Sequence, residues 1–177
     1  NYYLFRVPPL TVVGDGASAK IGGHIKKYNV KRAFIVTDKV IIKLGLLEQT
    51  LRSLRKQNID YVIFDEIEPD PTDTVVYKGV AYYKQSNADC IIGFGGGSPI
   101  DAAKAIAVLV NNDLKLDSSH IEEEINGRPV LVAAPTTAGT GTEVTDVTVI
   151  TNTTANIKIV IKHPLMIPDI ALIDPNL

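Results

Sequence analysis

The sequence has one cysteine, no tryptophan and only 6% aromatic residues among its 177 positions. A single cysteine cannot form a disulfide within the chain, and Cys90 lies in an apolar stretch, so we expect it to be a small buried side chain. The three histidines, His24, His120 and His163, are scattered, and no two have the i, i+4 spacing of a helical metal site. The residues therefore predict neither a disulfide framework nor a histidine metal site.

Charge and hydrophobicity exclude further classes of protein. The formal net charge is −2, and the basic patches with interleaved aromatics that are typical of nucleic-acid binding are absent. No stretch approaches the roughly 20 continuous apolar residues of a membrane helix, and the start of the sequence lacks the layout of a signal peptide. We therefore expect a cytoplasmic protein with neither a nucleic-acid nor a membrane partner. A hydrophobic content of 45% is enough for one domain with a substantial core, spanning 1–177.

Strand-like and helix-like stretches alternate along most of the chain, which is typical of parallel βαβ units. An extended segment at 5–13 comes first, and two β-branched runs near the end, 147–151 and 157–161, flank a polar turn and predict a hairpin. Capping-box spacing also allows a short helix at 119–124. The expected strands are 33–37, 61–64, 90–94 and 130–134, and the main expected helices are 17–28, 45–57, 74–86 and 98–109. We predict an α/β fold with a doubly wound, mostly parallel sheet and an appended β-hairpin.

The most informative motif is a glycine-rich run between an apolar strand and an alanine-rich helix. Its residues are Gly95, Gly96, Gly97, Ser98, Pro99, Ile100 and Asp101. Consecutive glycines let an anion approach main-chain N–H groups, and the following helix adds the positive end of its dipole. We expect Ser98 to be the N-cap and Asp101 the capping-box acid. Lys104 lies too far into the helix for a Walker A site. The run predicts a phosphate-binding turn, although a turn rich in glycine only for close packing is an alternative.

Polar residues follow several of the expected strands, and the carboxyl ends of parallel strands share one edge of the sheet. Asp38 follows the first strand and Asp70 comes shortly after the second, while a threonine-rich loop follows the fourth. Asp38 could accept hydrogen bonds from an adenosine ribose and repel a 2′-phosphate, which would select NAD, or it could simply cap a helix or lie in a solvated turn. The neighbouring Lys39 weakens the exclusion of NADP.

Several segments together resemble the N-terminal domain of the iron-containing (group III) alcohol dehydrogenases, within the wider dehydroquinate synthase-like fold. The similar segments are 35–39, 69–72, 95–107, 135–145 and 167–175. The lactaldehyde reductase and 1,3-propanediol dehydrogenase branch is the most similar. The resemblance implies a Rossmann-like, NAD(P)-binding domain from an enzyme that acts on small primary alcohols or aldehydes.

The resemblance also assigns roles to residues. Asp38 would contact the adenosine ribose, the glycine run the pyrophosphate, and Lys158 the nicotinamide side, while Asp70 occupies a position where the family often has Asn. The full set expected to bind the cofactor is Asp38, Asp70, Gly95, Gly96, Gly97, Ser98, Asp101, Thr136, Thr137, Thr140, Thr145 and Lys158. No catalytic residue and no metal ligand is expected in this chain.

In the resembled family, Fe²⁺ or Zn²⁺ is bound by one Asp and three His of a helical C-terminal domain, which we expect to be missing here. The chain alone would then bind NAD(H) without turnover. The resemblance further implies a homodimer formed through the N-terminal segment. Two alternatives stay open: a glycerol or glycerol phosphate dehydrogenase of related fold, and a non-catalytic nucleotide-binding or dimerisation module.

Overall fold

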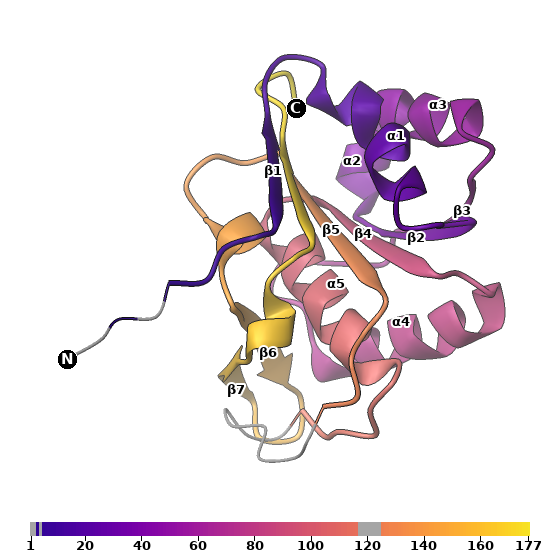
Figure 1. The fold of residues 1–177 in the computed structure, drawn as a ribbon. Coiled ribbons are helices and arrows are strands. Elements are labelled where there is room, and N and C mark those ends of the chain that lie inside the picture. The colour runs from indigo at the N-terminus through magenta and orange to yellow at the C-terminus, as the bar shows by residue number, and fades with distance from the viewer. Residues whose placement is uncertain (1–2, 4, 117–124) are drawn as a thin grey trace.

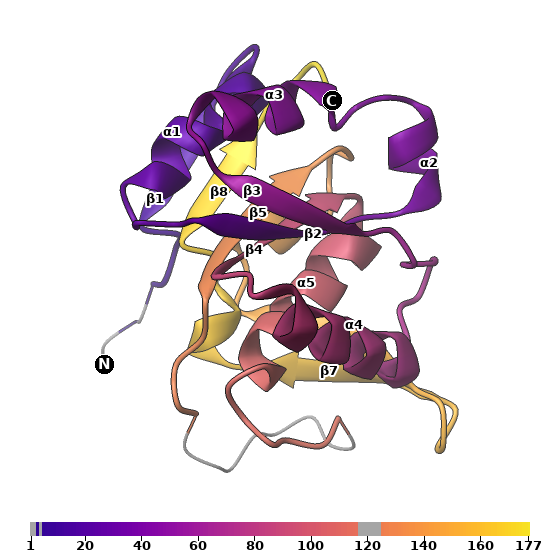
Figure 2. The same cartoon turned by 90° about the vertical axis from the view of Figure 1, so that its right-hand side faces the viewer.

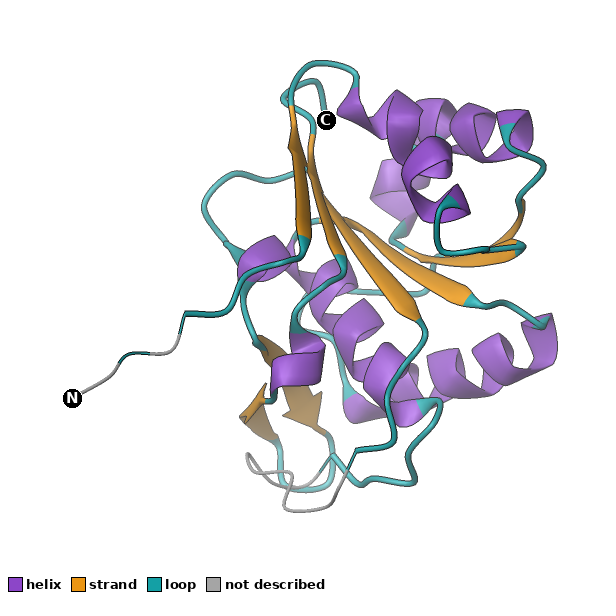
Figure 3. Ribbon diagram, in the orientation of Figure 1, coloured by secondary structure: helices purple, strands orange, loops and turns teal. Residues whose placement is uncertain are grey.

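A computed structural model describes residues 3, 5–116 and 125–177, and the helix expected at 119–124 lies outside them. The described chain forms a six-stranded sheet with helices on both faces and a separate two-stranded hairpin (Figures 1 and 3). This is the doubly wound α/β architecture with an appended hairpin that the sequence predicts.

The six strands run in the order β1-β8-β5-β4-β2-β3, and every neighbouring pair is parallel. Their bounds are β1 (Leu10–Val13), β2 (Arg32–Val36), β3 (Asp60–Phe64), β4 (Cys90–Gly95), β5 (Val130–Pro135) and β8 (Ile170–Ile173). The hairpin strands, β6 (Val147–Asn152) and β7 (Ile157–Lys162), pair antiparallel. Cys90 is buried in β4, as expected, and burial raises the pKa of its thiol.

Helices connect the parallel strands. The α-helices are α1 (Ile21–Lys26), α2 (Lys39–Lys43), α3 (Glu48–Lys56), α4 (Asp73–Ser86) and α5 (Gly97–Leu109). The 3₁₀ helices are η1 (Ala17–Lys20), η2 (Thr142–Val144) and η3 (Pro164–Met166). The helices expected at 45–57, 74–86 and 98–109 are confirmed as α3, α4 and α5, whereas the one expected at 17–28 is divided into η1 and α1.

Successive residues of each buried strand point to opposite faces of the sheet, so the sheet contributes to two apolar cores. Ala33 and Ile35 of β2 pack with α1, α2 and α3 on one face. Phe34 and Val36 pack on the other face with α4 and α5 (Figures 1 and 2). A sheet buried on both faces explains why its strands read as near-continuous apolar runs.

The hairpin covers the outer side of α5, so this helix lies between the sheet and the hairpin (Figure 1). Ile150 of β6 and Ile159 and Ile161 of β7 belong to the same buried core as the α5 side chains. Ten of the thirteen residues of α5 are buried, including Lys104. Burial on both sides explains why alanines fill so much of this helix.

Beyond the short 3₁₀ helices η2 and η3, a strand and an α-helix are not predicted by the sequence. Strand β8 has only four residues and follows Pro168 and Asp169, yet it lies inside the sheet between β1 and β5. Helix α2 has only five residues and depends on Asp38, whose side chain accepts hydrogen bonds from the first N–H groups. Both depend on long-range pairing or on a local cap rather than on periodicity.

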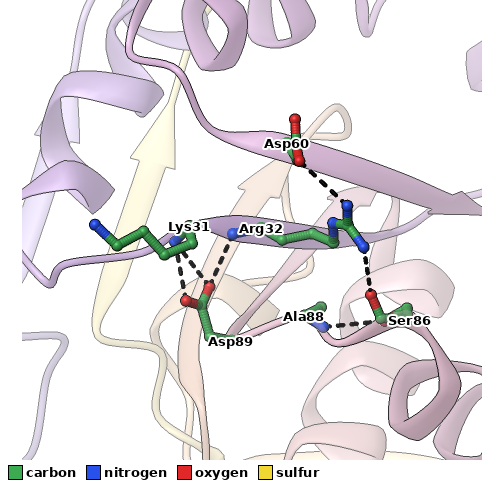
Figure 4. A network of polar contacts seen from close by, with 6 residues as sticks. All are labelled: Lys31, Arg32, Asp60, Ser86, Ala88 and Asp89. Carbon is green, nitrogen blue, oxygen red and sulfur yellow. Dashed lines mark hydrogen bonds and ion pairs between the residues drawn. The ribbon is translucent and has the colours of Figure 1, made fainter.

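At the amino edge of the sheet, a polar network joins three strands (Figure 4). The Asp89 carboxylate accepts hydrogen bonds from the backbone N–H groups of Lys31 and Arg32, at 2.9 to 3.1 Å. The Arg32 guanidinium donates to Asp60 at 3.1 Å and to the carbonyl of Ser86 at 2.9 Å. These contacts fasten the strand beginnings, which lie opposite the edge where ligands bind in such sheets.

Candidate functional site

The order of the strands reverses between β2 and β4. From β2 the chain continues outward to β3, whereas β4 is followed by β5 on its other side. A cleft of about 690 Å³ lies at the carboxyl ends of these two strands, and this volume is suited to a small-molecule ligand. Its walls are formed by residues 38–41, 65–69, 96–99, 136 and 137. The cleft therefore lies where open α/β sheets bind ligands.

The glycine turn, residues 95–98, forms one wall. Gly95 has a φ of +141°, and a methyl group on it would lie 2.8 Å from Cγ of Pro99 and 3.5 Å from Oδ2 of Asp38. The position therefore needs glycine both for its backbone angle and for space. Helix α5 begins at Gly97, with Gly96 at the N-cap, so Ser98 lies in the first turn instead of capping it. Because Gly96 has no side chain to cap them, the first N–H groups of α5 are available to an anion.

Asp38 forms the facing wall at the end of β2. Its Oδ1 accepts hydrogen bonds from the N–H groups of Val40 at 2.8 Å and Ile41 at 2.9 Å, so the helix-cap interpretation is correct. Its other carboxylate oxygen, Oδ2, lies on the side of Gly95. Capping through one oxygen leaves the second oxygen in position to accept a hydrogen bond from a ligand hydroxyl.

The threonine loop, residues 136–145, lies against the glycine turn. The Thr136 N–H donates to the carbonyl of Gly95 at 2.8 Å, and both Thr136 and Thr137 line the cleft. A methyl group on Gly97 would lie 3.5 Å from Cγ2 of Thr140, which places that residue beside the turn as well. The structure thus brings the glycine turn, Asp38 and part of the threonine loop together.

Six expected cofactor residues lie outside the cleft lining: Gly95 and Thr140, which lie beside it, and Asp70, Asp101, Thr145 and Lys158. Asp70 and Lys158 form an ion pair of 2.7 Å with each other, and both are exposed. Thr145 Oγ1 accepts a hydrogen bond from Lys104. Asp101 accepts from the backbone of Val149 in the hairpin at 3.2 Å, so it does not form the expected capping box. A cofactor role for these residues, as for the others of the expected set, remains a prediction.

Three acidic residues that are not among the expected cofactor residues form another part of the cleft wall. These residues are Asp65, Glu66 and Glu68, which follow β3. The backbone of Glu66 forms an isolated antiparallel β-bridge with that of Asp38. Val40, Ile41 and Ile67 add apolar surface. The available signal is the position of Asp65 and Glu66 after a strand, the same signal that identifies Asp38. The cleft can therefore hold a ligand that has an apolar part, hydroxyl groups and an anionic centre.

Neither a metal-binding cluster nor a membrane-spanning helix occurs in the part of the chain that the structure describes. In residues 3, 5–116 and 125–177, no three His, Cys, Asp or Glu side chains are grouped closely enough to hold a metal ion. The described helices likewise include none with the length and apolar character needed to cross a bilayer. The described side chains therefore do not fit a catalytic metal, and no step is assigned to one.

Comparison with known proteins decides the family. The iron-containing alcohol dehydrogenase family matches residues 8–175. The chain belongs to this family. It is 37% identical over 175 residues to the NAD-dependent methanol dehydrogenase of Bacillus methanolicus, covering 98% of the chain and 46% of that protein. It is 39% identical over 182 residues to the 1,3-propanediol dehydrogenase of Citrobacter freundii, covering 100% of the chain and 47% of that protein.

A solved structure supports the same assignment. The crystal structure of a 1,3-propanediol oxidoreductase superimposes with a TM-score of 0.95 at 36% identity, covering 99% of this chain and 46% of that one. The chain therefore spans about half the length of the relatives that it matches. Its fold is that of the Rossmann-like N-terminal domain of the iron-containing alcohol dehydrogenases.

Proposed function

We propose that this chain is the NAD(H)-binding domain of a cytoplasmic alcohol dehydrogenase. The observation that carries the proposal is the cleft at the strand-order reversal, where the uncapped start of α5 faces the Asp38 carboxylate. The N–H groups at Gly97 and Ser98 would bind the pyrophosphate. Oδ2 of Asp38 would accept a hydrogen bond from the adenosine ribose, and the apolar side chains of Val40, Ile41 and Ile67 would lie against the adenine.

The charge of the cleft favours NAD over NADP. Asp38, Asp65, Glu66 and Glu68 all line it, and Lys39 is the cation among the lining residues. Glu66 also forms an ion pair with Lys78, so part of this charge is compensated. A 2′-phosphate brought next to Asp38 would face an excess of negative charge, which disfavours its binding.

The names of the relatives, which include methanol and 1,3-propanediol dehydrogenases, support a proposal for the substrate class. We propose small primary alcohols and the corresponding aldehydes as substrates of the whole protein. Bound NAD supplies the hydride acceptor for such an oxidation. The residues described here bind and orient the cofactor, and we expect the chain alone to bind NAD(H) without turnover. A glycerol or glycerol phosphate dehydrogenase is the alternative within the same fold.

Titration of the chain with NADH, followed by nucleotide fluorescence and by calorimetry, tests the proposal. We expect saturable binding of one NADH per chain and weaker binding of NADPH. Absence of saturable NADH binding at millimolar concentration would contradict it. Alcohol oxidation by the pure chain, with or without added Fe²⁺ or Zn²⁺, would contradict the expectation that it lacks turnover.

We also propose that the chain associates as a homodimer through its N-terminal segment. Strand β1 is an edge strand whose partner in the sheet is β8. Tyr3 and Phe5, just before β1, have exposed fractions of 94% and 89%. Free strand edges and exposed aromatics favour association. Light scattering of Phe5→Asp against the unchanged chain tests this. A stable dimer without NADH binding would favour a dimerisation module.

A further inference from the structure

Lys104 is a fully buried lysine that the proposed function leaves unused. It lies in the second turn of α5, and its exposed fraction is 0%. Lysine is almost never fully buried unless its charge is compensated. Burial lowers the pKa of Lys104 to about 8, and the carboxylates of Asp101, Glu143 and Asp146 oppose this shift. Such a costly residue at the centre of a helix calls for a physical reason.

The hydrogen bonds of Lys104 supply that reason. Its ammonium group donates to the carbonyl of Thr145 at 2.9 Å, to Oγ1 of Thr145 at 3.2 Å and to the carbonyl of Val147 at 2.9 Å. An ammonium group has three N–H donors, so all three are used. The acceptors belong to Thr145, the last residue of the threonine loop, and to Val147, the first residue of β6. Lys104 is therefore a cross-link between α5 and residues 145–147.

The threonine loop is fastened at one end to the last residue of β4 and at the other to α5, the two elements that the glycine turn connects. At its beginning, the Thr136 N–H donates to the carbonyl of Gly95 at 2.8 Å. At its end, Lys104 holds Thr145. Between the two anchors, Gly139 and Gly141 have positive φ values of 105° and 65°. Glycines in this part of the loop add conformational freedom, so the end anchors have to set its position.

We propose that Lys104 is a positioning residue that holds the threonine loop over the glycine turn and so preforms the cleft. The ligand in this inference, NAD(H), rests on the proposed function, whereas the position of the loop does not. An apolar side chain could fill the same volume. It would leave the two carbonyls and the Thr145 hydroxyl without their donor, and buried acceptors without partners are destabilising.

Lys104 is not needed merely to fasten the hairpin to α5, because other hydrogen bonds already do so. Thr148 of β6 already joins the hairpin to α5, because its hydroxyl donates to the carbonyl of Asp101 at 2.7 Å. The Asp101 carboxylate accepts from the N–H of Val149 at 3.2 Å. These two contacts fasten the body of β6, whereas Lys104 reaches Thr145 at the end of the threonine loop and Val147, the first residue of β6. The lysine therefore acts on the loop that leads to the cleft.

The test compares Lys104→Met with the matched control Asn112→Leu. Asn112 is also buried, and its amide donates to the carbonyls of Val108 and Gly127, neither of which belongs to the threonine loop. Hydrogen exchange is measured by mass spectrometry over peptides that cover 136–149. We expect Lys104→Met to speed exchange there by about tenfold, because local opening becomes easier. Asn112→Leu should leave these peptides unchanged.

NADH affinity is measured on the same three proteins. We expect the Kd to rise about tenfold in Lys104→Met and to stay within about twofold in Asn112→Leu. Unchanged exchange over 136–149 in Lys104→Met would overturn the inference, whatever the chain binds. Faster exchange with unchanged NADH affinity would overturn the role in preforming the cleft.

Two further results separate the possible failures. If the unchanged chain binds no NADH, the proposed function fails, and the exchange result still decides whether Lys104 positions the loop. If Lys104→Met does not fold, Lys104→Gln replaces it, because the amide keeps two donors on a shorter side chain. For Lys104→Gln we expect the same local increase in exchange, and its absence in the folded variant would overturn the inference.

Discussion

Ser18 and Asp174 are 156 positions apart, yet the Ser18 hydroxyl donates a hydrogen bond of 2.6 Å to Oδ2 of Asp174. The same carboxylate accepts from the backbone N–H groups of Gly16 and Ser18, each at 3.0 Å. Asp174 directly follows β8, and Gly16 and Ser18 follow β1, so the carboxylate joins the ends of two neighbouring strands. The carboxyl ends of β1 and β8 are thereby held together at one edge of the sheet.

Replacing Asp174 should be costly. Asp174→Ala leaves the backbone N–H groups of Gly16, Ser18 and Asn176 and the Ser18 hydroxyl without their acceptor, at a residue that is only 4% exposed. We expect a loss of about 3 kcal/mol in the free energy of unfolding, measured by urea titration. The control is Asp15→Ala, which removes an exposed carboxylate in the same turn and should change stability by less than about 0.5 kcal/mol.

The Asp174 site also predicts an acid dependence. Burial alone would raise the pKa of Asp174, but hydrogen bonds from Ser18, Asn176 and Gly16 together outweigh it and lower the pKa. A lowered pKa stabilises the folded state above the ordinary value of about 3.9, and this contribution is lost as pH falls through the lowered pKa. The difference in stability between the unchanged chain and Asp174→Ala should therefore shrink below about pH 4. A difference that stays constant between pH 7 and pH 3 would contradict this account.

Gly95 should not tolerate a side chain. At a φ of +141°, with Pro99 only 2.8 Å from an added methyl group, Gly95→Ala must distort the turn. We expect a loss of about 1–3 kcal/mol in stability and at least about tenfold weaker NADH binding. Gly23→Ala is the matched control, because a methyl group there meets nothing within 4 Å. It lies in α1 and should stabilise the chain by about 0.5–1 kcal/mol.

Asp38 combines a structural and a selective role, and two substitutions separate them. Asp38→Asn keeps an oxygen for the N–H groups of Val40 and Ile41, so we expect stability to change by less than about 0.5 kcal/mol. Asp38→Ala removes the cap and should cost about 1 kcal/mol. Both remove the negative charge and should improve the affinity for NADPH relative to NADH by about tenfold. An unchanged ratio in calorimetric titrations of both variants would show that Asp38 does not select the cofactor.

The exposed ion pair between Lys158 and Asp70 offers a test of the predicted contact to the nicotinamide side. Exposed ion pairs contribute little, so Lys158→Ala should change stability by less than about 1 kcal/mol. If Lys158 contacts the cofactor, the same variant should bind NADH about tenfold more weakly. Lys162→Ala is the control on the same strand, because Lys162 faces Asp146 at 3.9 Å. Equal NADH affinity in both variants would remove Lys158 from the site.

Local patterns predict much of this fold and only part of the site. Strands β2 to β5 follow from continuous apolar runs, and Asp38 and the glycine turn follow from their position after two of them. Strand β8 could not be predicted, because its four residues form a strand only through pairing with β1 and β5. The burial of Lys104 could not be predicted either, since it requires the hairpin to fold back over α5. Contacts between residues that are distant in the sequence are therefore what local patterns cannot predict.

The placement of α5 between the sheet and the hairpin has a thermodynamic consequence for any ligand at its first turn. A helix buried on both sides has little freedom to shift, because close-packed interiors resist small displacements. Gly93 and Gly79 reinforce this, since a methyl group on either would lie 2.8 Å or less from a side chain of α5. The N–H groups at Gly97 and Ser98 are thus ordered before binding. An incoming anion would lose little affinity to ordering the protein, so binding should resemble lock-and-key recognition more than induced fit.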